Sequence, residues 1–174
     1  MIEILRLSHR IRRDKRLSSH VALASRAFGA NKVYYSGQHD SSLENSINKI
    51  VKRWGNHFSI EYIKSPLNLI KQKKKNSFFI IHLTCYGLEL KKEIQKIRKK
   101  KKILVVVGSE KVPPEIYKIS DLNLSISNQP HSEVSALAIF LHEYFQGKEL
   151  TKQFKNAKLK VIPKGKGKLV KHNI

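Results

Sequence analysis

Two stretches that are apolar almost throughout, residues 78–83 and 103–107, are the feature that most constrains the fold. A third stretch, residues 122–126, follows at a similar spacing. Strands this apolar need cover on both faces, and segments with helical periodicity separate them. Strands that alternate with helices form parallel sheets. The sequence therefore predicts an α/β domain with a largely parallel sheet flanked by helices.

The remaining elements fit the same plan. Further strands are expected at residues 2–7, 33–35 and 58–63, and helices at 42–54, from Pro66, at 90–99, after Pro113 and at 132–145. Residues 10–16 are expected to form a very basic loop, followed by a helix that Ser18 or Ser19 caps and Gly29 ends. We expect residues 1–150 to form the domain and 151–174 a basic extension with one docked strand and a mobile tip.

The charge balance points to a polyanionic partner. The chain has 35 Lys and Arg against 13 Asp and Glu, a net charge of +22. Anionic membranes or an unusually basic cellular background are alternatives, but the lysines are clustered, as in nucleic-acid-binding proteins. The clusters are residues 10–16, 71–75, 99–102 and the tail. Within the first, the residues expected to contact the nucleic acid are Arg10, Arg12, Arg13, Lys15 and Arg16.

Other classes of protein are disfavoured. The chain has no apolar run of the roughly 20 residues that span a bilayer, and its first residues lack the plan of a signal peptide. A single cysteine, Cys85, excludes an internal disulfide and a multi-cysteine zinc site. We therefore expect a cytoplasmic protein without a membrane partner or a metal.

Two polar loops follow the strongest strands, at residues 108–113 and 127–133. In open α/β sheets, ligands bind beyond the carboxyl ends of central strands. The first loop opens with Gly108, where backbone can approach a ligand closely. In the second, His131 or Ser132 could cap the next helix and leave N–H groups facing the crevice. Taken singly, either loop is better interpreted as an ordinary turn. Together, at two strand ends, they indicate a ligand pocket as readily as two ordinary turns.

Histidines and the cysteine offer weaker candidates. His9, His82 and His131 have the titration range of a general base. His82 sits in an apolar run and is better interpreted as a core residue, whereas for His131 a loop-shaping role is as reasonable as a catalytic one. Cys85 is disfavoured as a nucleophile.

Several motifs together resemble a known family, the archaeal tRNA 2′-O-methyltransferases that modify the T-loop cytidine at position 56. The resemblance covers most of residues 2–163, and the most specific motif is the heptapeptide at 128–134. The motifs lie at residues 6–10, 13–16, 20–23, 26–29, 53–55, 82–87, 105–113 and 128–134. The family belongs to the SPOUT superfamily, so the resemblance implies a trefoil knot in the C-terminal half, a homodimer, a tRNA substrate and S-adenosylmethionine as cofactor.

The superfamily's three motifs imply roles for particular residues. Arg26, six residues after His20, matches the catalytic arginine, with a surface salt bridge as its alternative role. Gly108, Ser109 and Glu110 match the second motif, where Glu110 could equally fix the loop. The third motif departs from the usual pattern and leaves its polar role open among His131, Ser132 and Ser135. The implied cofactor pocket comprises Leu83, Gly108, Ser109, Glu110, Lys111, Val112, Ile126, Ser127, Asn128, Gln129, Pro130, His131, Ser132 and Glu133.

Two rival functions remain. A non-catalytic RNA-binding protein with the same fold would explain the altered third motif. An enzyme of another nucleotide-using class is disfavoured, because the chain has neither a P-loop nor a Gly-x-Gly-x-x-Gly after a strand.

Overall fold

The parallel sheet is the frame of the molecule. The computed structural model describes residues 1–108 and 111–172, and in this part six strands form one sheet in the order β3-β2-β1-β5-β4-β6. All neighbouring pairs in it are parallel, which confirms the predicted fold class. The strands are β1 (Ile2–His9), β2 (Lys32–Gly37), β3 (Ser59–Tyr62), β4 (Phe79–Glu89), β5 (Ile103–Val107) and β6 (Leu122–Ser125).

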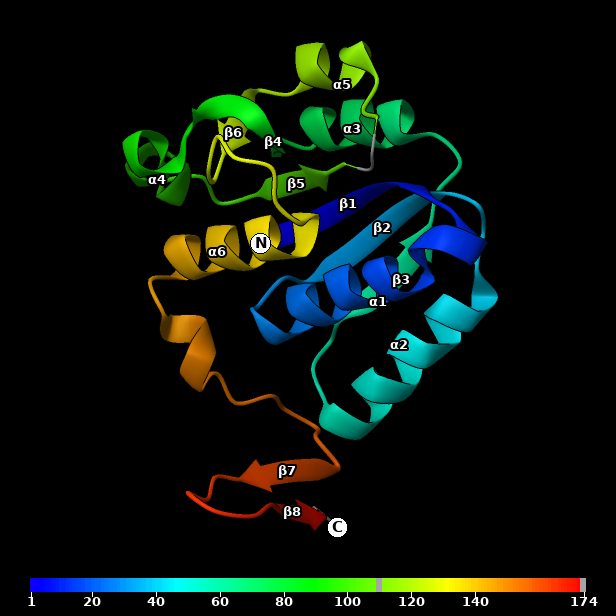
Figure 1. Ribbon diagram of the computed structural model, residues 1–174, viewed down its shortest axis with the longest axis vertical. Helices are drawn as coiled ribbons and strands as arrows, with labels where there is room; N and C mark the ends of the chain where they lie inside the picture. Colours follow the sequence, from blue (N-terminus) through cyan, green and yellow to red (C-terminus); the bar gives the residue numbers. More distant parts are fainter. Residues whose placement is uncertain (109–110, 173–174) are drawn as a thin grey trace.

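Helices cover both faces of the sheet (Figure 1). One face carries α1 (Ile11–Ala27), α2 (Ser41–Trp54), α4 (Leu90–Arg98) and α6 (Glu133–Phe145). The other carries α3 (Pro66–Lys75) and α5 (Pro114–Ile119). Side chains alternate between the two cores along each strand, so Ile4 faces the α1 side and Leu5 the α3 side. This two-sided burial is why the central strands are so apolar.

Helix α1 begins earlier than the sequence indicated. Residues 11–16 are helical, so the prediction of a basic loop there was wrong. The N-cap, Arg10, makes no capping bond through its own side chain. Instead Gln38 accepts from the backbone N–H of Ile11 (2.8 Å) and Asp14 from that of Arg10 (3.1 Å). These groups satisfy N–H donors that a helix start leaves free, and Gln38 comes from a segment 27 residues away.

Strand β4 extends six residues beyond the apolar run that predicted it, to Glu89. Its residues Leu83 and Leu88 both pair with Leu124 of β6, so the intervening segment bulges around that strand. Gly87 lies against the β6 backbone, where an added Cβ would be 2.5 Å from the nitrogen of Leu124. Only glycine fits so close an approach.

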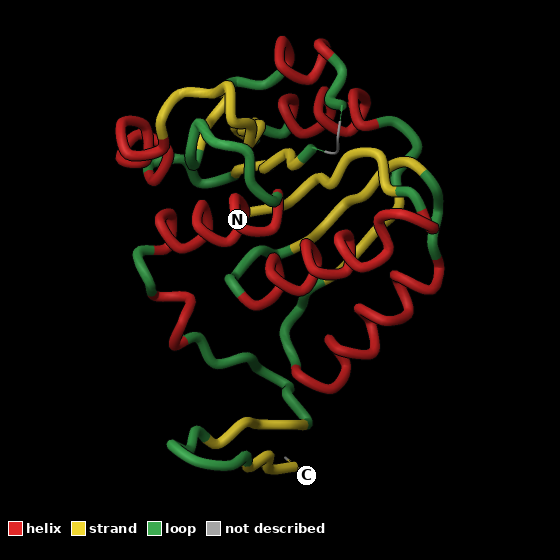
Figure 2. Tube along the Cα trace, in the orientation of Figure 1, coloured by secondary structure: helices red, strands yellow, loops and turns green. Residues whose placement is uncertain are grey.

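The chain ends in a small separate hairpin. After the 3₁₀ turn η1 (Lys148–Thr151), strands β7 (Leu159–Ile162) and β8 (Leu169–His172) pair antiparallel with each other. The prediction of a single strand was wrong, because two strands pair here. The predicted docking on the domain is confirmed, since β7 contacts α2, and Figure 2 shows the hairpin beyond the sheet, below the end of α2. It is tied to α2 through the backbone, with Lys158 N–H donating to Arg53 O at 2.9 Å. Within the described residues, no helix is long and apolar enough to cross a bilayer.

Candidate functional site

A pocket of about 370 Å³ lies at the carboxyl edge of the sheet, where β4, β5 and β6 end. The pocket is therefore in the place where open α/β sheets bind ligands. It is built by β4, the loop after β5, helix α5, the loop between β6 and α6, and the start of α6. Its lining residues are His82, Leu83, Thr84, Cys85, Tyr86, Gly108, Val112, Tyr117, Ile126, Pro130, His131, Glu133 and Ala136.

The structure brings together half of the residues predicted to hold a cofactor. Those that line the pocket are Leu83, Gly108, Val112, Ile126, Pro130, His131 and Glu133. Those that do not line it are Lys111, Ser127, Asn128, Gln129 and Ser132. Ser109 and Glu110 lie outside the described residues. Both predicted loops thus contribute to one pocket, as we expected from their positions at the carboxyl ends of central strands.

Two residues of the second group hold the pocket walls in place. Asn128 Nδ2 donates to Cys85 O at 2.6 Å and so ties the β6–α6 loop to the end of β4. Ser132 Oγ accepts from Val134 N–H at 3.1 Å and caps α6, as predicted. The capped helix start points its remaining N–H groups toward the loop. These residues shape the pocket without lining it.

A buried arginine, Arg6, contacts both the loop after β5 and the start of α6. It leaves β1 with a side chain only 1% exposed. Its Nη1 donates to Leu7 O and, at 2.7 Å, to Gly108 O, while Nη2 lies 3.4 Å from Glu133 Oε1. Burial lowers the pKa of the guanidinium, and the Glu133 carboxylate opposes that shift. One cation therefore fixes the first residue of one loop and the first residue of α6.

His82 forms a second buried polar group at the pocket wall. It is 1% exposed, and its Nδ1 lies 3.0 Å from Asn123 Oδ1. Tyr117 packs edge-on against the ring with 4.6 Å between centroids. Burial lowers the pKa of His82, and the hydrogen bond with Asn123 offsets part of that effect. The histidine that we predicted to be a core residue thus also lines the pocket.

This burial should make stability pH-dependent. Between the lowered folded pKa of His82 and the ordinary value near 6.5, the unfolded chain binds a proton that the folded chain does not. The free energy of unfolding should therefore fall as pH drops below about 6.5, by up to about 1.4 kcal/mol per pH unit for this group. Urea unfolding between pH 5 and 8 should give a shallower slope for His82→Gln. The exposed His57→Gln serves as control; parallel curves for wild type and His82→Gln would refute the assignment.

The other two candidate histidines have different surroundings. His9 is fully buried, with Nδ1 2.8 Å from Ser18 Oγ and Nε2 3.4 Å from Asp40 Oδ2. Asp40 in turn caps α2 by accepting from Leu43 N–H. His9 therefore joins β1, α1 and α2 and does not line the pocket. His131 is exposed at the pocket rim, with Nδ1 3.1 Å from Ser132 O.

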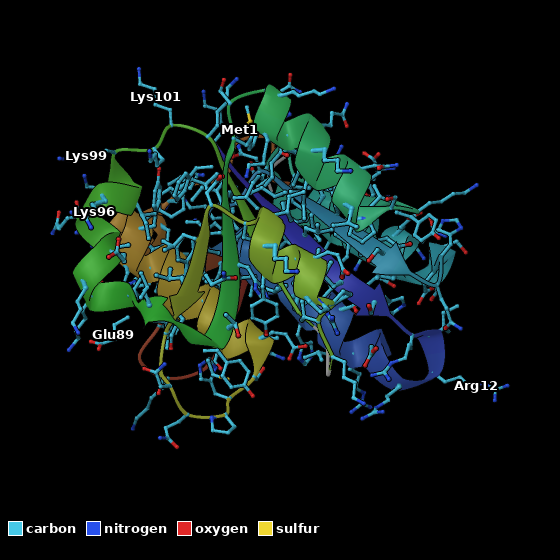
Figure 3. All side chains as sticks on the ribbon, turned by 90° about the horizontal axis from the view of Figure 1, so that it is seen from above. Met1, Arg12, Glu89, Lys96, Lys99 and Lys101 are labelled. Atoms are coloured by element: carbon cyan, nitrogen blue, oxygen red, sulfur yellow. The ribbon has the colours of Figure 1, made fainter. Side chains whose placement is uncertain are left out.

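The predicted RNA-contacting residues lie on the first turns of α1, which begins at the same edge of the sheet as the pocket. Arg12, Arg13 and Arg16 are exposed, and Arg12 stands out into solvent in Figure 3. Arg10 Nε donates to Asp14 Oδ2 at 2.9 Å. Burial raises the pKa of the Asp14 carboxyl, but its bonds with Arg10 outweigh this and the net shift is downward. The side chain of Lys15 lies outside what the structure describes.

In a single copy of the chain, Arg26 lies at the opposite edge of the sheet from this pocket. It occupies the last turn of α1, at the amino edge of the sheet. Its Nη2 donates to Gly55 O at 2.8 Å, and its guanidinium lies 4.8 Å from the centre of the Phe154 ring. The side chain is 7% exposed, and burial lowers its pKa. The surface salt bridge weighed as its alternative role does not describe this buried environment.

Comparison with known proteins decides the family. The model of the tRNA ribose 2′-O-methyltransferase family, aTrm56, matches residues 54–171, a range that contains every residue lining the pocket. The chain belongs to the aTrm56 family. Two relatives named tRNA (cytidine(56)-2′-O)-methyltransferase, from Methanocaldococcus jannaschii and Methanopyrus kandleri, are 47% and 46% identical to it. The matches cover 98% and 96% of this chain and 96% and 94% of those proteins.

Solved structures agree with the fold of this aTrm56 protein. The TrmH/SpoU tRNA modifying enzyme of A. aeolicus aligns with a TM-score of 0.61 at 18% identity, over 86% of this chain and 76% of that one. The SpoU methyltransferase AviRb from Streptomyces viridochromogenes, in complex with AdoMet, gives 0.62 at 11% identity, over 88% and 61%. At these identities the likeness concerns the fold.

Sequence reasoning missed several contributors to the site of this aTrm56 protein. Thr84, Tyr117 and Ala136 line the pocket, and Thr84 Oγ1 lies 3.3 Å from Tyr117 Oη. Thr84 lies within the motif at residues 82–87 but was not assigned to the pocket, and no local pattern marked Tyr117 or Ala136. Arg6 did carry a signal: an arginine within the apolar strand at residues 2–7 has to be buried and therefore needs partners. Its partners, however, are more than 100 residues away.

Proposed function

We propose that this protein methylates the ribose 2′-hydroxyl of cytidine 56 in tRNA, with S-adenosylmethionine as the methyl donor. The observation that carries this proposal is the near-full-length identity of 46–47% with enzymes of that name, because the matching segment contains all of the pocket. Because its substrate is tRNA, we propose that the protein acts in the cytoplasm.

The pocket has the properties that this cofactor needs. Its volume of about 370 Å³ lies in the range of small-molecule sites. Leu83, Ile126 and Ala136 offer apolar surface for an adenine ring, and backbone groups of the two loops offer polar contacts. Gly108 keeps one wall open, since an added Cβ would be 2.5 Å from Val112 Cγ2. In the described residues, no group of acidic, histidine or cysteine side chains could hold a metal ion.

The chain's own task is alignment and electrostatics. When bound, S-adenosylmethionine supplies a methyl group that its sulfonium has already activated. Arg6 holds Gly108 and Glu133 in one geometry, so the loops do not need to reorganise during the reaction. A ribose hydroxyl entering over His131 would meet the capped start of α6, whose N–H dipoles favour a developing negative charge.

The exposed arginines of α1 are suited to hold the tRNA near the pocket. Arg12, Arg13 and Arg16 project from the carboxyl edge of the sheet, the same edge as the pocket. Guanidinium groups bind phosphates with paired hydrogen bonds. We assign these residues to the RNA strand that carries the modified nucleotide.

A catalytic role for Arg26 calls for a second copy of the chain. Helices α1 and α6 pack together on one face and both run from the carboxyl to the amino edge. On α6, Ser135, Ile139 and His142 are exposed, and Ile139 retains 46% of its surface. Antiparallel association of two such faces would bring the Arg26 end of one chain to the pocket edge of the other. We therefore propose a homodimer in which Arg26 serves the partner's pocket.

A trefoil knot in the C-terminal half is a further part of the proposal. It is supported by membership of the aTrm56 family, since the resemblance to that family implies the SPOUT-type knot. Pulling both ends of a single molecule apart tests it. A knotted chain stretches to a shorter length than an unknotted chain of 174 residues.

Mass spectrometry of modified RNA tests the function itself. An unmodified tRNA transcript incubated with protein and S-adenosylmethionine should gain one methyl group, on the ribose of cytidine 56. A transcript with 2′-deoxycytidine at that position is the matched control and should gain none. tRNA that is bound but not methylated would overturn the proposal in favour of a non-catalytic RNA-binding protein.

A further inference from the structure

A second basic surface lies at the amino edge of the sheet, opposite the pocket. It comprises the end of α3 and the segment between α4 and β5, whose lysines are Lys71, Lys73, Lys74, Lys75, Lys99, Lys100, Lys101 and Lys102. We call this surface the amino-edge patch. Figure 3 labels Lys99 and Lys101 beside Met1, on the opposite side of the molecule from Arg12.

Tertiary contacts join the two lysine runs into one surface. Lys102 Nζ donates to Asn76 O at 3.2 Å, and Phe79 N–H donates to Lys102 O at 2.9 Å. Between the runs lies a hollow of about 370 Å³, lined by Phe78 and Phe79 together with neighbouring lysines. Lys100 Nζ lies 4.7 Å from the centre of the Phe79 ring. Lys73 and Lys102, one from each run, both lie over the Phe78 ring, with Nζ 4.7 and 5.8 Å from its centre, so the two runs meet there.

Structural duties account for only some of these charges. Lys74 donates to Ile119 O at 2.8 Å, and Lys102 caps the end of α3 at Asn76 O. Lys73 pairs with Glu3, and Lys74 with Asp121. By contrast, Lys71, Lys75, Lys99 and Lys101 are exposed and have no acidic partner among the described residues. Four uncompensated cations on one edge repel one another and favour a polyanion.

The patch is too far from the chain's own pocket to serve the same nucleotide. Strand β5 separates the two edges, and its five residues span roughly 17 Å at about 3.3 Å each. Lys71 and Lys75 belong to α3, which covers the face opposite α1 and α6. A partner chain on the α1–α6 face therefore leaves them open.

We propose that the amino-edge patch binds the phosphodiester backbone of the tRNA outside the arm that carries the modified nucleotide. This inference rests on the proposed function for the identity of the RNA. It assigns to the patch a share of substrate affinity and no share of the chemical step. Selection of whole tRNA over an isolated T-arm follows, since Lys71 and Lys75 lie on the α3 face, away from the α1–α6 face that meets the partner's pocket, and only the whole molecule reaches both faces.

Binding measurements on two RNAs test the proposal. One variant combines Lys71→Gln, Lys75→Gln, Lys99→Gln and Lys101→Gln, and a control with equal charge loss combines Lys49→Gln, Lys52→Gln, Lys64→Gln and Lys91→Gln. At 0.15 M salt, the patch variant should bind whole tRNA at least about tenfold more weakly, and its log–log salt slope should be shallower by about 3. A T-arm stem–loop should bind wild type and patch variant equally. Circular dichroism checks that both variants fold.

Other outcomes are decisive as well. Equal weakening by the control variant would mean that net charge, and not the patch, attracts the RNA. Equal weakening toward the stem–loop would place the patch on the modified arm and overturn the proposal. Unchanged tRNA binding, with loss of binding to phosphatidylserine vesicles, would assign the patch to a membrane. Because these assays measure binding without methyl transfer, they separate failure of the patch from failure of the proposed reaction.

Discussion

Replacing Arg6 with methionine should weaken binding of S-adenosylmethionine by about tenfold or more and lower the free energy of unfolding by about 2 kcal/mol. Methionine fills similar space but donates nothing to Gly108 O, which then lies unpaired behind the pocket. Glu133 also loses its cation, so the start of α6 is no longer held against the first loop. Isothermal titration calorimetry and urea unfolding measure the two effects.

Arg98→Met is the matched control for this change. Arg98 also donates to a backbone carbonyl, that of Glu143 at 3.0 Å, and its Nη2 also lies 3.4 Å from a glutamate, Glu143 Oε2. It joins α4 to α6 without touching the pocket. We expect Arg98→Met to lower stability while leaving cofactor affinity within about twofold. If both variants bind the cofactor equally well, Arg6 has no positioning role.

Arg26→Ala should lower kcat by about 10²-fold or more, the loss expected when a fixed cation near a developing oxyanion is removed. Cofactor affinity should stay close to that of the wild type, because Arg26 does not line the chain's own pocket. Phe154→Ala removes the ring that covers the guanidinium but keeps the cation. A purely structural Arg26 would make these two variants alike in stability and in turnover.

Subunit mixing tests whether Arg26 acts across a dimer. Arg26→Ala is mixed with Gly108→Trp, whose indole would fill the cofactor pocket. In a mixed dimer, one pocket is intact and receives Arg26 from its partner, so an equal mixture should recover about a quarter of the wild-type activity. Recovery of none would show that Arg26 does not act in trans.

How far sequence reasoning reached depended on the range of the interactions involved. The apolar runs predicted the parallel sheet, since burial on both faces leaves a pattern in consecutive residues. The same argument placed Gly108 and the segment at 127–133 at the carboxyl ends of two central strands. In the sheet β4 lies between these two strands, and the loops share the pocket through Gly108, Pro130, His131 and Glu133. The start of α1 was missed because Gln38, from a distant segment, satisfies the N–H of Ile11.

The sequence by itself determined the layered α/β fold, the two loops of the pocket and the family, because periodicity, turn residues and motifs are all local properties. Only the tertiary structure decided where the charged side chains lie and which groups they contact. It buried Arg6 between Gly108 and Glu133, and it placed Arg26 at the edge opposite the pocket. It also gathered the two lysine runs into one patch. The physical reason is that a charge's partners are set by folding in space, and the chain order of residues does not record them.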